Sequence, residues 1–528
     1  MKKNISPDAY VIKNSRTPIV RTQYGKVNGY VRNGVYIFKG IPYGDDTSGS
    51  GRFMPPQKPQ PWRGVRSCSS YGFNCPQPDN YAWDNDEEAW LFEWNIGPQN
   101  EDCLCLNIWT TEISCINKRP VMVWLHGGAF MTGSAYELKA YDGENISRNE
   151  DVVMVSLNHR LNAFGFLDLS NYAEKYAYSA NVGMMDIVLA LEWIKDNIAE
   201  FGGDPDCITI FGQSGGGGKI CALMGMPSAE GLFHRAIIQS GSLGYHLTPD
   251  QSSAVTNKFL KALNIDGNSI SRLQGLSSLE IVNAACYAVK PLIQPHPLID
   301  FRHASELMGW APVLDGHILT ANAFNPTPSH LKKIPILVGS TFNEFTTAIG
   351  HPEYWDWTDK ELITAVSNAL KNDKIKEAVN MVKKIYPNLR PFQQWSVIAS
   401  STVRGAAIEQ AKSKALTGGA AAYIYYFTWQ SPLLDGRPMS FHCSEIPFVF
   451  NNINICNHMT GGGCDAQNLS NNMSKAWVNF ARNGDPNHSG IPEWPAFTPE
   501  NNASMVFDTV CEVITQKDRL LQQLIGRR

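Results

Sequence analysis

The feature that most limits the fold of this chain is a series of short apolar runs separated by longer stretches with helical spacing. Turn-forming residues such as Gly, Pro, Asn and Asp bound these runs, as is typical of strands buried on both faces. The runs occupy residues 121–125, 152–157, 208–211, 236–239, 334–338 and 421–427. Buried strands that alternate with helices predict an α/β protein with a mostly parallel central sheet and helices on both faces.

The clearest predicted helix lies between the second and third runs. Apolar residues at positions 182, 185, 188, 189 and 194 keep a helical spacing, and Gly202 and Gly203 are expected to end the helix. In a parallel sheet of this kind, ligands bind outside the carboxyl ends of the strands. Functional residues are therefore expected in the loops that follow the strands.

Composition and charge argue against several classes of function. Apolar residues make up 43 % of the chain and the formal net charge is −4, so a large core is expected and a nucleic-acid-binding face is not. No apolar run reaches the roughly 18 residues of a membrane span. The first residues lack the apolar stretch of an intact secretory signal, so a cytoplasmic protein is expected for the sequence as written. A secreted or periplasmic location is expected instead if a signal has been removed.

The cysteines and glycines raise the question of a bound metal or nucleotide. No pair of C-x-x-C units occurs among the twelve cysteines, which argues against a zinc site. The stretch GQSGGGGK (212–219) misses a phosphate-binding loop at two positions, because Gln213 stands for the first glycine and Ile220 for the hydroxyl residue. It also misses the last glycine of a dinucleotide fingerprint. No cofactor is expected.

The same stretch fits G-x-S-x-G, with Gly212, Ser214 and Gly216 between a predicted strand and a predicted helix. In such a nucleophile elbow the serine occupies a strained turn, and the flanking glycines provide clearance. The N–H of Gly215 has no intrahelical partner and can face a developing oxyanion. Gly217 and Gly218 exceed what the turn needs, and either tight helix packing or a wide pocket would account for them.

A second loop supplies the other half of an oxyanion hole. WLHGGAFMTG (124–133) follows the strand 121–125 and is similar to the HGGG loop of esterases, with Ala129 in place of the third glycine. The alanine still has a free N–H to offer.

Many further segments occur in one order along the chain. They are FKGIPYG and GRFMPP within 38–56, EDCLCLNIW (101–109), NHRLNAFGFL (158–167), DNIAEFGGDPDCITIFGQSGG (196–216), FHRAIIQSGS (233–242), APVLDG (311–316), GSTFNEF (339–345), FHCSEIPFVF (441–450) and WVNFARNGDPN (477–487). Together they resemble the type-B carboxylesterases, a family that includes cholinesterases and bacterial p-nitrobenzyl esterases. The resemblance covers about residues 18–508 and implies one large α/β-hydrolase domain, here placed at residues 15–525.

The resemblance also implies the site residues. Ser214 matches the family nucleophile, Glu344 the acid and His442 the base, in the chain order expected for this fold. The amides of Gly128, Ala129 and Gly215 match the oxyanion hole. These residues imply hydrolysis of a small-molecule ester through an acyl-enzyme, without a metal.

Several implications are less specific. Gln213 stands where most of the family has glutamate, which removes a negative charge beside the nucleophile and disfavours choline esters. Gly215 stands for the usual alanine and is expected to enlarge the space at the acyl carbon. Trp94 resembles a tryptophan on which cholinesterases stack a quaternary ammonium, although such tryptophans are also common as pocket wall or core.

The resemblance further implies a disulfide between Cys75 and Cys103 in an oxidising compartment and free thiols in the cytosol. Ser240 and Glu445 are candidates for supporting positions near His442. Two other kinds of function remain open: a binding or adhesion relative without catalysis, and an amidase, thioesterase or lipase that uses the same residues. The natural substrate and the oligomeric state do not follow from the sequence.

Overall fold

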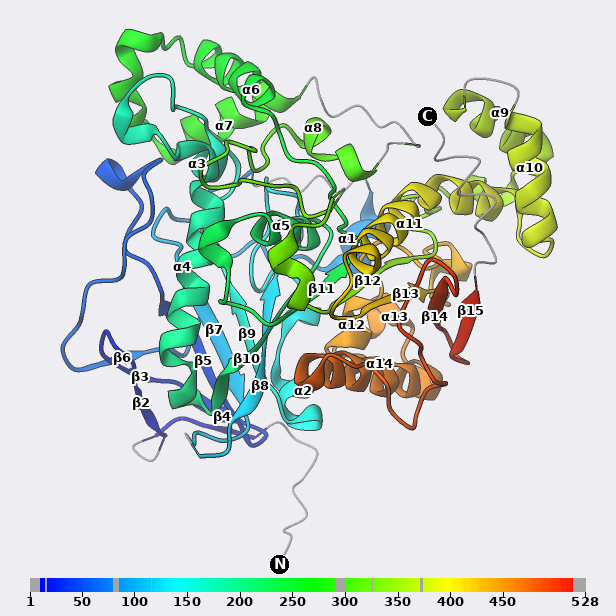
Figure 1. Ribbon diagram of the computed structural model, residues 1–528, viewed down its shortest axis with the longest axis horizontal. Coiled ribbons are helices and arrows are strands. Elements are labelled where there is room, and N and C mark those ends of the chain that lie inside the picture. The colour runs from blue at the N-terminus through cyan, green and yellow to red at the C-terminus, as the bar shows by residue number, and fades with distance from the viewer. Residues whose placement is uncertain are drawn as a thin grey trace, which may run out of the picture.

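All six apolar runs form neighbouring strands of one large sheet in the computed structural model (Figure 1). The structure describes residues 10–14, 17–78, 85–114, 116–290, 298, 301–324, 326–370 and 374–515. Both limits of the expected domain, residues 15 and 525, lie outside these ranges.

The large sheet is parallel in its centre and antiparallel at its edges. Its strands, in spatial order, are β1 (Val11–Ile12), β4 (Tyr30–Arg32), β5 (Val35–Pro42), β7 (Cys105–Thr110), β9 (Val153–Leu157), β8 (Arg119–Leu125), β10 (Gly203–Gln213), β11 (Arg235–Gln239), β12 (Ile336–Thr341), β13 (Ala422–Phe427), β14 (Ala503–Phe507) and β15 (Glu512–Thr515). Every pairing from β9 to β14 is parallel, and the pairings outside them are antiparallel. A small separate sheet contains β2 (Ile19–Arg21), β3 (Lys26–Asn28) and β6 (Val65–Ser67).

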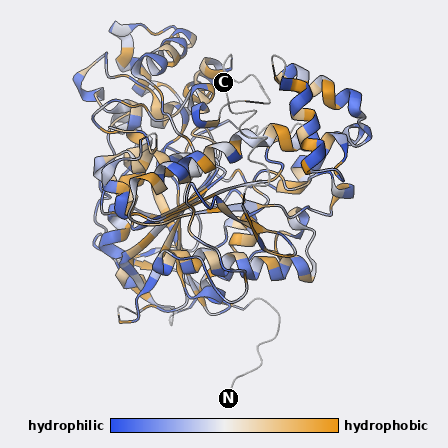
Figure 2. Ribbon diagram, turned by 45° about the vertical axis from the view of Figure 1, so that its right-hand side comes forward, coloured by the Kyte–Doolittle hydropathy of each residue, from blue (hydrophilic) through white to orange (hydrophobic). Residues whose placement is uncertain are grey.

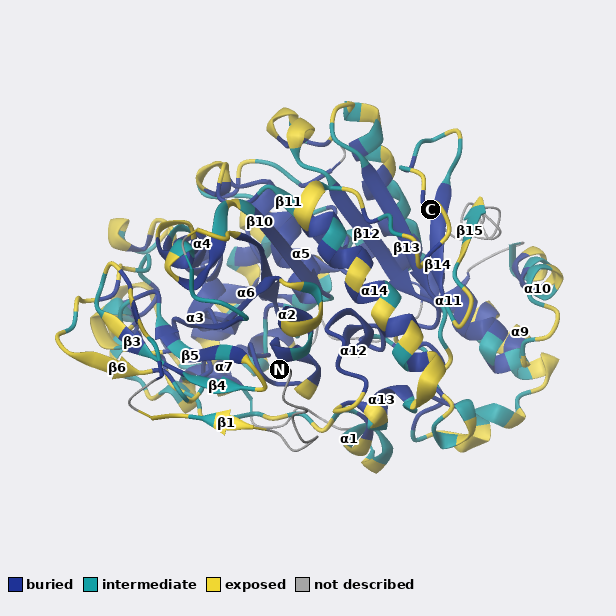
Figure 3. Ribbon diagram, turned by 90° about the horizontal axis from the view of Figure 1, so that it is seen from below, coloured by how far each residue is buried: buried dark blue, intermediate teal, exposed yellow. Residues whose placement is uncertain are grey.

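Alternate side chains of the parallel strands enter two apolar cores, one on each face of the sheet. In β8, Val121 and Val123 belong to the first core, and Met122 and Trp124 belong to the second. Successive side chains of a strand point to opposite faces, so a continuous apolar run is what a sheet covered on both sides requires. The central strands are accordingly buried (Figure 3) and apolar (Figure 2).

The helices divide between the two cores in the same way. The first core contains residues of α3 (Asn162–Phe166), α4 (Val182–Asn197), α5 (Gly215–Met224), α6 (Pro249–Ala262), α7 (Ser278–Val289), α8 (Ser305–Met308) and the second half of α11 (Pro391–Thr417). The second contains residues of α1 (Asp86–Phe92), α2 (Glu144–Glu150), α12 (Ile446–Val449), α13 (Asn457–Thr460) and α14 (Gly463–Asn483). A third, smaller core joins α9 (Asp359–Ala369) and α10 (Lys374–Ile385) to the start of α11.

The predicted helix between the second and third runs is confirmed. It is α4, continued by a 3₁₀ turn at Ile198–Phe201, and it ends at Gly202, whose φ of 79° is left-handed. Such a glycine is a common helix terminator because it has no β-carbon to clash in this conformation.

None of the helices within the described ranges is both long and apolar enough to span a membrane.

Candidate active site

Ser214 lies at the sharp turn between β10 and α5. Its backbone has φ 57° and ψ −124°, a strained conformation for a residue with a side chain, and its N–H donates to the Gln239 carbonyl at 2.8 Å. The flanking glycines have no space for a side chain. A β-carbon at Gly212 would lie 2.6 Å from the Leu125 carbonyl oxygen, and one at Gly216 would lie 2.0 Å from the same atom. The glycines of G-x-S-x-G are therefore required by the close approach of α5 to the end of β8.

Glu344 and His442 form a direct pair. Nδ1 of His442 is 2.5 Å from Oε2 of Glu344, and the His442 N–H donates to the Glu344 carbonyl at 2.9 Å. The other carboxylate oxygen of Glu344 accepts from Ser240 Oγ at 2.8 Å and from the Thr341 N–H at 2.9 Å. Because backbone and side-chain bonds both join the loop after β12 to the loop that carries His442, the orientation of the imidazole is well determined.

Ser214 and His442 are brought to the same place without a direct bond. Within the described residues, Ser214 Oγ has no hydrogen-bond partner, and Nε2 of His442 is 3.1 Å from the side-chain nitrogen of Gln213. The Phe345 ring covers the imidazole at a centroid distance of 4.0 Å. Hydrogen bonds between catalytic groups commonly tighten only when substrate is bound.

The loop after β8 presents free amides to the serine. The Gly128 carbonyl accepts from the N–H groups of Met131 and Thr132, both at 3.1 Å, which folds the loop into a tight turn. Among the described residues, the N–H groups of Gly128, Ala129 and Gly215 donate to no other protein group. Ala129 is in direct backbone contact with Gly215. Three unpaired donors are therefore carried by the residue after Ser214 and by the loop that contacts it, and unpaired N–H groups are what an oxyanion hole requires.

The expectation that Gly215 enlarges the space at the acyl carbon is wrong. A β-carbon at Gly215 would lie 2.1 Å from the Ala129 carbonyl oxygen, so the backbone of Ala129 fills the space that an alanine side chain would take. The glycine therefore allows the backbone after Ser214 to contact the backbone of the loop that follows β8.

Backbone strain is concentrated around this site. Five non-glycine residues here have positive φ: Ala129 (55°), Ser214 (57°), Ser240 (48°), Glu344 (37°) and Cys443 (79°). Such conformations persist only where surrounding contacts hold them, and they cluster at functional sites. Ser214, Gly128, Ala129 and His442 are also half-buried, whereas most of their neighbours are fully buried.

Gly217 and Gly218 serve helix packing. A β-carbon at Gly217 would lie 2.8 Å from the α-carbon of Gly241 and 2.9 Å from the Ile238 side chain, and one at Gly218 would lie 2.5 Å from the Leu243 side chain. The second pair of glycines thus lets α5 approach the end of β11 and the loop after it.

Gly217→Ala is expected to destabilise the protein by about 1–3 kcal/mol, because the added methyl group overpacks a contact with backbone atoms. The matched control is Gly405→Ala in the interior of α11, where no atom lies within 4 Å of the added β-carbon. This control should be neutral or stabilising by up to about 1 kcal/mol. Urea unfolding of both variants measures the difference, and equal stability of the two would contradict the packing role.

Gln213 is buried, and its side chain faces the base. Besides the contact with His442, its Oε1 accepts from the Cys443 thiol at 3.3 Å. Burial raises the pKa of the Cys443 thiol well above its ordinary value, so this thiol is neutral. The neutral amide of Gln213 thus lies between the imidazole of His442 and a neutral thiol.

Trp94 is half-buried. Its ring stacks on Phe92 with a centroid distance of 5.2 Å. It also lines a cavity of about 10 Å³ together with Gln77 and Glu137, which is room for one water molecule. Trp94 is therefore part of a wall next to Gly133 and Ser134, at the end of the loop that follows β8 (residues 126–133, here named the oxyanion loop).

Cys75 and Cys103 are both free, buried thiols in the structure. They lie side by side, since a hydrogen bond with Cys75, together with burial, holds the pKa of Cys103 well above its ordinary value.

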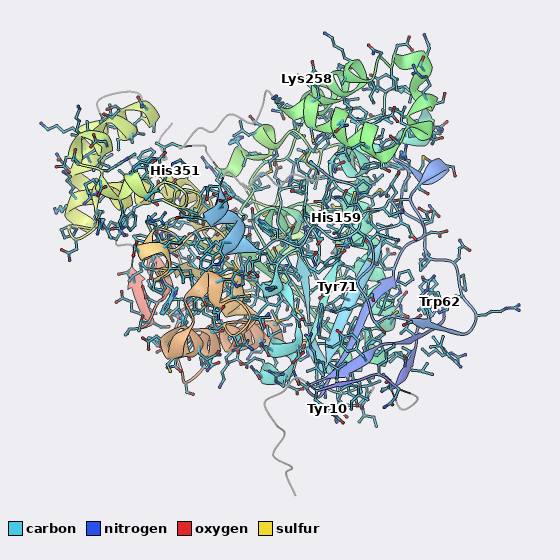
Figure 4. All side chains as sticks on the ribbon, turned by 180° about the vertical axis from the view of Figure 1, so that it is seen from behind. Tyr10, Trp62, Tyr71, His159, Lys258 and His351 are labelled. Carbon is cyan, nitrogen blue, oxygen red and sulfur yellow. The ribbon has the colours of Figure 1, made fainter. Side chains whose placement is uncertain are left out.

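His126, the first residue of the loop after β8, and His159, labelled in Figure 4, are both buried, and their rings stack at a centroid distance of 5.2 Å. Nδ1 of His126 contacts the Gly127 carbonyl at 3.0 Å, and Nδ1 of His159 contacts the Arg160 carbonyl at 2.8 Å. Burial lowers the pKa of both imidazoles well below the ordinary value, and both are neutral. Among the described residues, no group of three His, Cys, Asp or Glu side chains is arranged to hold a metal ion.

Two residues at the site were not singled out in the sequence. Phe345 follows Glu344 directly, so its place near the site could have been expected, but its contact with His442 depends on the fold. Lys219 was considered only as part of a phosphate-binding loop. In the structure it is fully buried on α5 and donates to carbonyls of the oxyanion loop.

Comparison with known proteins shows the family of the chain. A sequence model of the carboxylesterase family matches residues 16–522. The para-nitrobenzyl esterase of Bacillus subtilis (strain 168) is 33 % identical over 503 residues, which cover 95 % of this chain and 96 % of that protein.

Two solved structures are similar over nearly the whole chain. An esterase of Clostridium hathewayi that can hydrolyse aliphatic aromatic polyesters is 38 % identical, with a TM-score of 0.84 over 98 % of this chain and 100 % of that one. A carboxylesterase of Geobacillus stearothermophilus is 33 % identical, with a TM-score of 0.77 over 96 % and 99 % of the two chains. The fold is the α/β-hydrolase fold. The chain therefore belongs to the carboxylesterase family and is a carboxylic ester hydrolase.

Proposed function

We propose that this enzyme hydrolyses esters through an acyl-enzyme on Ser214, with His442 as base and Glu344 as the residue that orients it. The observation that carries the proposal is the 2.5 Å contact between His442 and Glu344 next to a half-buried serine in a strained turn. A serine hydroxyl is a weak nucleophile, and it needs an adjacent base that is itself held in place.

The reaction runs in two halves. In the first, Ser214 Oγ attacks the ester carbonyl carbon while Nε2 of His442 takes the hydroxyl proton, and the amides of Gly128, Ala129 and Gly215 bind the oxyanion. The imidazolium then gives this proton to the leaving alcohol, and the acyl group stays on Ser214. In the second half, a water molecule loses a proton to His442, attacks the acyl carbon, and releases the carboxylic acid.

Labelling of the wild-type enzyme tests the proposed nucleophile. Diethyl p-nitrophenyl phosphate should release one p-nitrophenol for each enzyme molecule and leave a diethylphosphoryl group on Ser214, located by peptide mass spectrometry. Labelling at another residue would refute the assignment. Rates on p-nitrophenyl esters of increasing acyl length address the lipase alternative, because a lipase would gain activity beyond about ten carbons, whereas a carboxylesterase prefers short chains.

We extend the proposal to esters that carry an aromatic group. Phe345 is 62 % exposed although it is a large apolar side chain, and its ring lies against the imidazole of His442. An exposed aromatic face beside the reacting groups can stack on an aromatic ring of a substrate. The related esterase that can hydrolyse aliphatic aromatic polyesters supports this substrate class.

Phe345→Ala is expected to reduce kcat/KM for ethyl benzoate about two- to tenfold relative to ethyl butyrate, because an aromatic pair contributes about 0.5–1.5 kcal/mol beyond the buried area. The matched control is Tyr287→Ala on α7, which removes an aromatic ring of similar exposure, 60 %. The ratio of the two kcat/KM values should not change in this control. An unchanged ratio in Phe345→Ala would contradict the role of the aromatic face.

A further inference from the structure

Lys219 is a buried lysine directly behind the loop that follows β8. Its side chain is fully buried, and its Nζ donates to the His126 carbonyl at 2.8 Å and to the Gly127 carbonyl at 3.3 Å. Among the described residues it forms no ion pair with a carboxylate, and Glu137 acts on it only through space. A buried ammonium without a contacting carboxylate is costly, so its retention at this place calls for a reason.

The carbonyls that Lys219 contacts belong to the loop that holds the oxyanion. The Gly127 carbonyl and the Gly128 N–H are the two ends of one peptide unit. The same carbonyl oxygen is also 3.0 Å from Nδ1 of His126. Donors at the carbonyl end polarise a peptide and make its N–H a stronger donor at the other end. The peptide that ends in the Gly128 N–H is thus polarised from behind by an imidazole and by an ammonium.

The surroundings of Lys219 make the charged form of its amine sensitive to the negative charge that develops during the reaction. Burial lowers the pKa of Lys219 to about 7, against a raising effect of Glu137. The imidazoles of His126 and His159, which face it from the ends of β8 and β9, are neutral. A negative oxyanion forming in front of the loop stabilises the ammonium. The favourable interaction is therefore larger in the tetrahedral intermediate than in the ground state, which is the condition for a catalytic effect.

We propose that Lys219 is a positioning residue of the oxyanion hole: its ammonium holds the His126 and Gly127 carbonyls and strengthens the Gly128 N–H toward the tetrahedral oxyanion. This inference rests on the proposed function, because it assigns Gly128 to the oxyanion hole of Ser214.

Lys219→Met tests the proposal, and Lys414→Met is its matched control. Lys414 is also a buried lysine, 1 % exposed, that donates to a backbone carbonyl, that of Lys332 at 3.1 Å, but it lies on α11 away from the site. Active sites are counted by stoichiometric phosphorylation of Ser214, so that rates refer to correctly folded enzyme. Lys219→Met should lose about 10- to 100-fold in kcat per labelled site, somewhat less than the loss of one direct donor, with KM within threefold.

Binding of an aryl trifluoromethyl ketone, which forms a hemiketal oxyanion on Ser214, separates positioning from a structural role. The affinity for this ketone should fall by the same factor as kcat in Lys219→Met and should be unchanged in Lys414→Met. Lys219→Gln keeps a donor to the carbonyls without the charge. It replaces Lys219→Met as the test variant if the methionine variant does not fold. It should show an intermediate loss.

A kcat per labelled site and a ketone affinity equal to those of the Lys414→Met control would overturn the inference. Failure of the proposed function looks different. In that case the wild-type enzyme itself would not be labelled at Ser214, and the inference would fall with it.

Discussion

Ser214→Ala is expected to lower kcat for p-nitrophenyl butyrate by on the order of 10⁴- to 10⁶-fold, to the level left by binding and the oxyanion hole alone. The substitution removes the atom that forms the acyl-enzyme, and the group next to Nε2 of His442, the amide of Gln213, is not a nucleophile that can replace it. The burst of p-nitrophenol and the labelling by an organophosphate should both disappear.

The fold should survive this substitution. Ser214 is half-buried, and its hydroxyl has no hydrogen-bond partner among the described residues, so little native structure is lost with it. The free energy of unfolding should change by less than about 0.5 kcal/mol, which urea unfolding can measure. A stably folded Ser214→Ala variant with near wild-type turnover would refute the assignment of Ser214 as the nucleophile.

Glu344→Gln is expected to lower kcat/KM by about 10³- to 10⁴-fold while keeping the shape of the side chain. The carboxylate accepts from Nδ1 of His442 on one oxygen, and from Ser240 and Thr341 on the other. An amide cannot accept on both sides, so it either leaves the imidazole in the wrong tautomer or breaks the contacts with Ser240 and Thr341. It also no longer stabilises the imidazolium that forms in the transition state.

Glu445→Gln is the matched control, because Glu445 is a second buried carboxylate three positions after the base. Its Oε1 accepts from the Gln239 side chain at 3.1 Å, and burial raises its pKa to about 7. Because the side-chain partner of Glu445 is Gln239 and not His442, its change to an amide should lower kcat/KM by less than about tenfold. Equal losses in the two glutamine variants would contradict the assignment of Glu344 as the orienting acid.

Much of the site was predictable because its signals are local. A serine between two glycines, after a β-branched run and before a helix, indicates a nucleophile elbow from a handful of residues. The supporting contacts were harder to predict. Ser240 was a candidate for a supporting position near His442, and the structure places its hydroxyl 2.8 Å from Glu344, the carboxylate that contacts His442. The expectation for Gly215 failed because the space beside it is filled by Ala129, a residue from another loop.

Local patterns in the sequence predicted the parallel strands and the elbow at Ser214, because apolar spacing and the steric needs of glycine act over a few residues. Glu344 and His442 followed only from the resemblance to a known family. Only the tertiary structure decided which atoms meet. Glu344 and His442 are 98 residues apart in the chain, and Lys219 and His126 are 93 apart. Contacts over such separations depend on how strands and helices pack, to within a fraction of an ångström, and no local pattern encodes that distance.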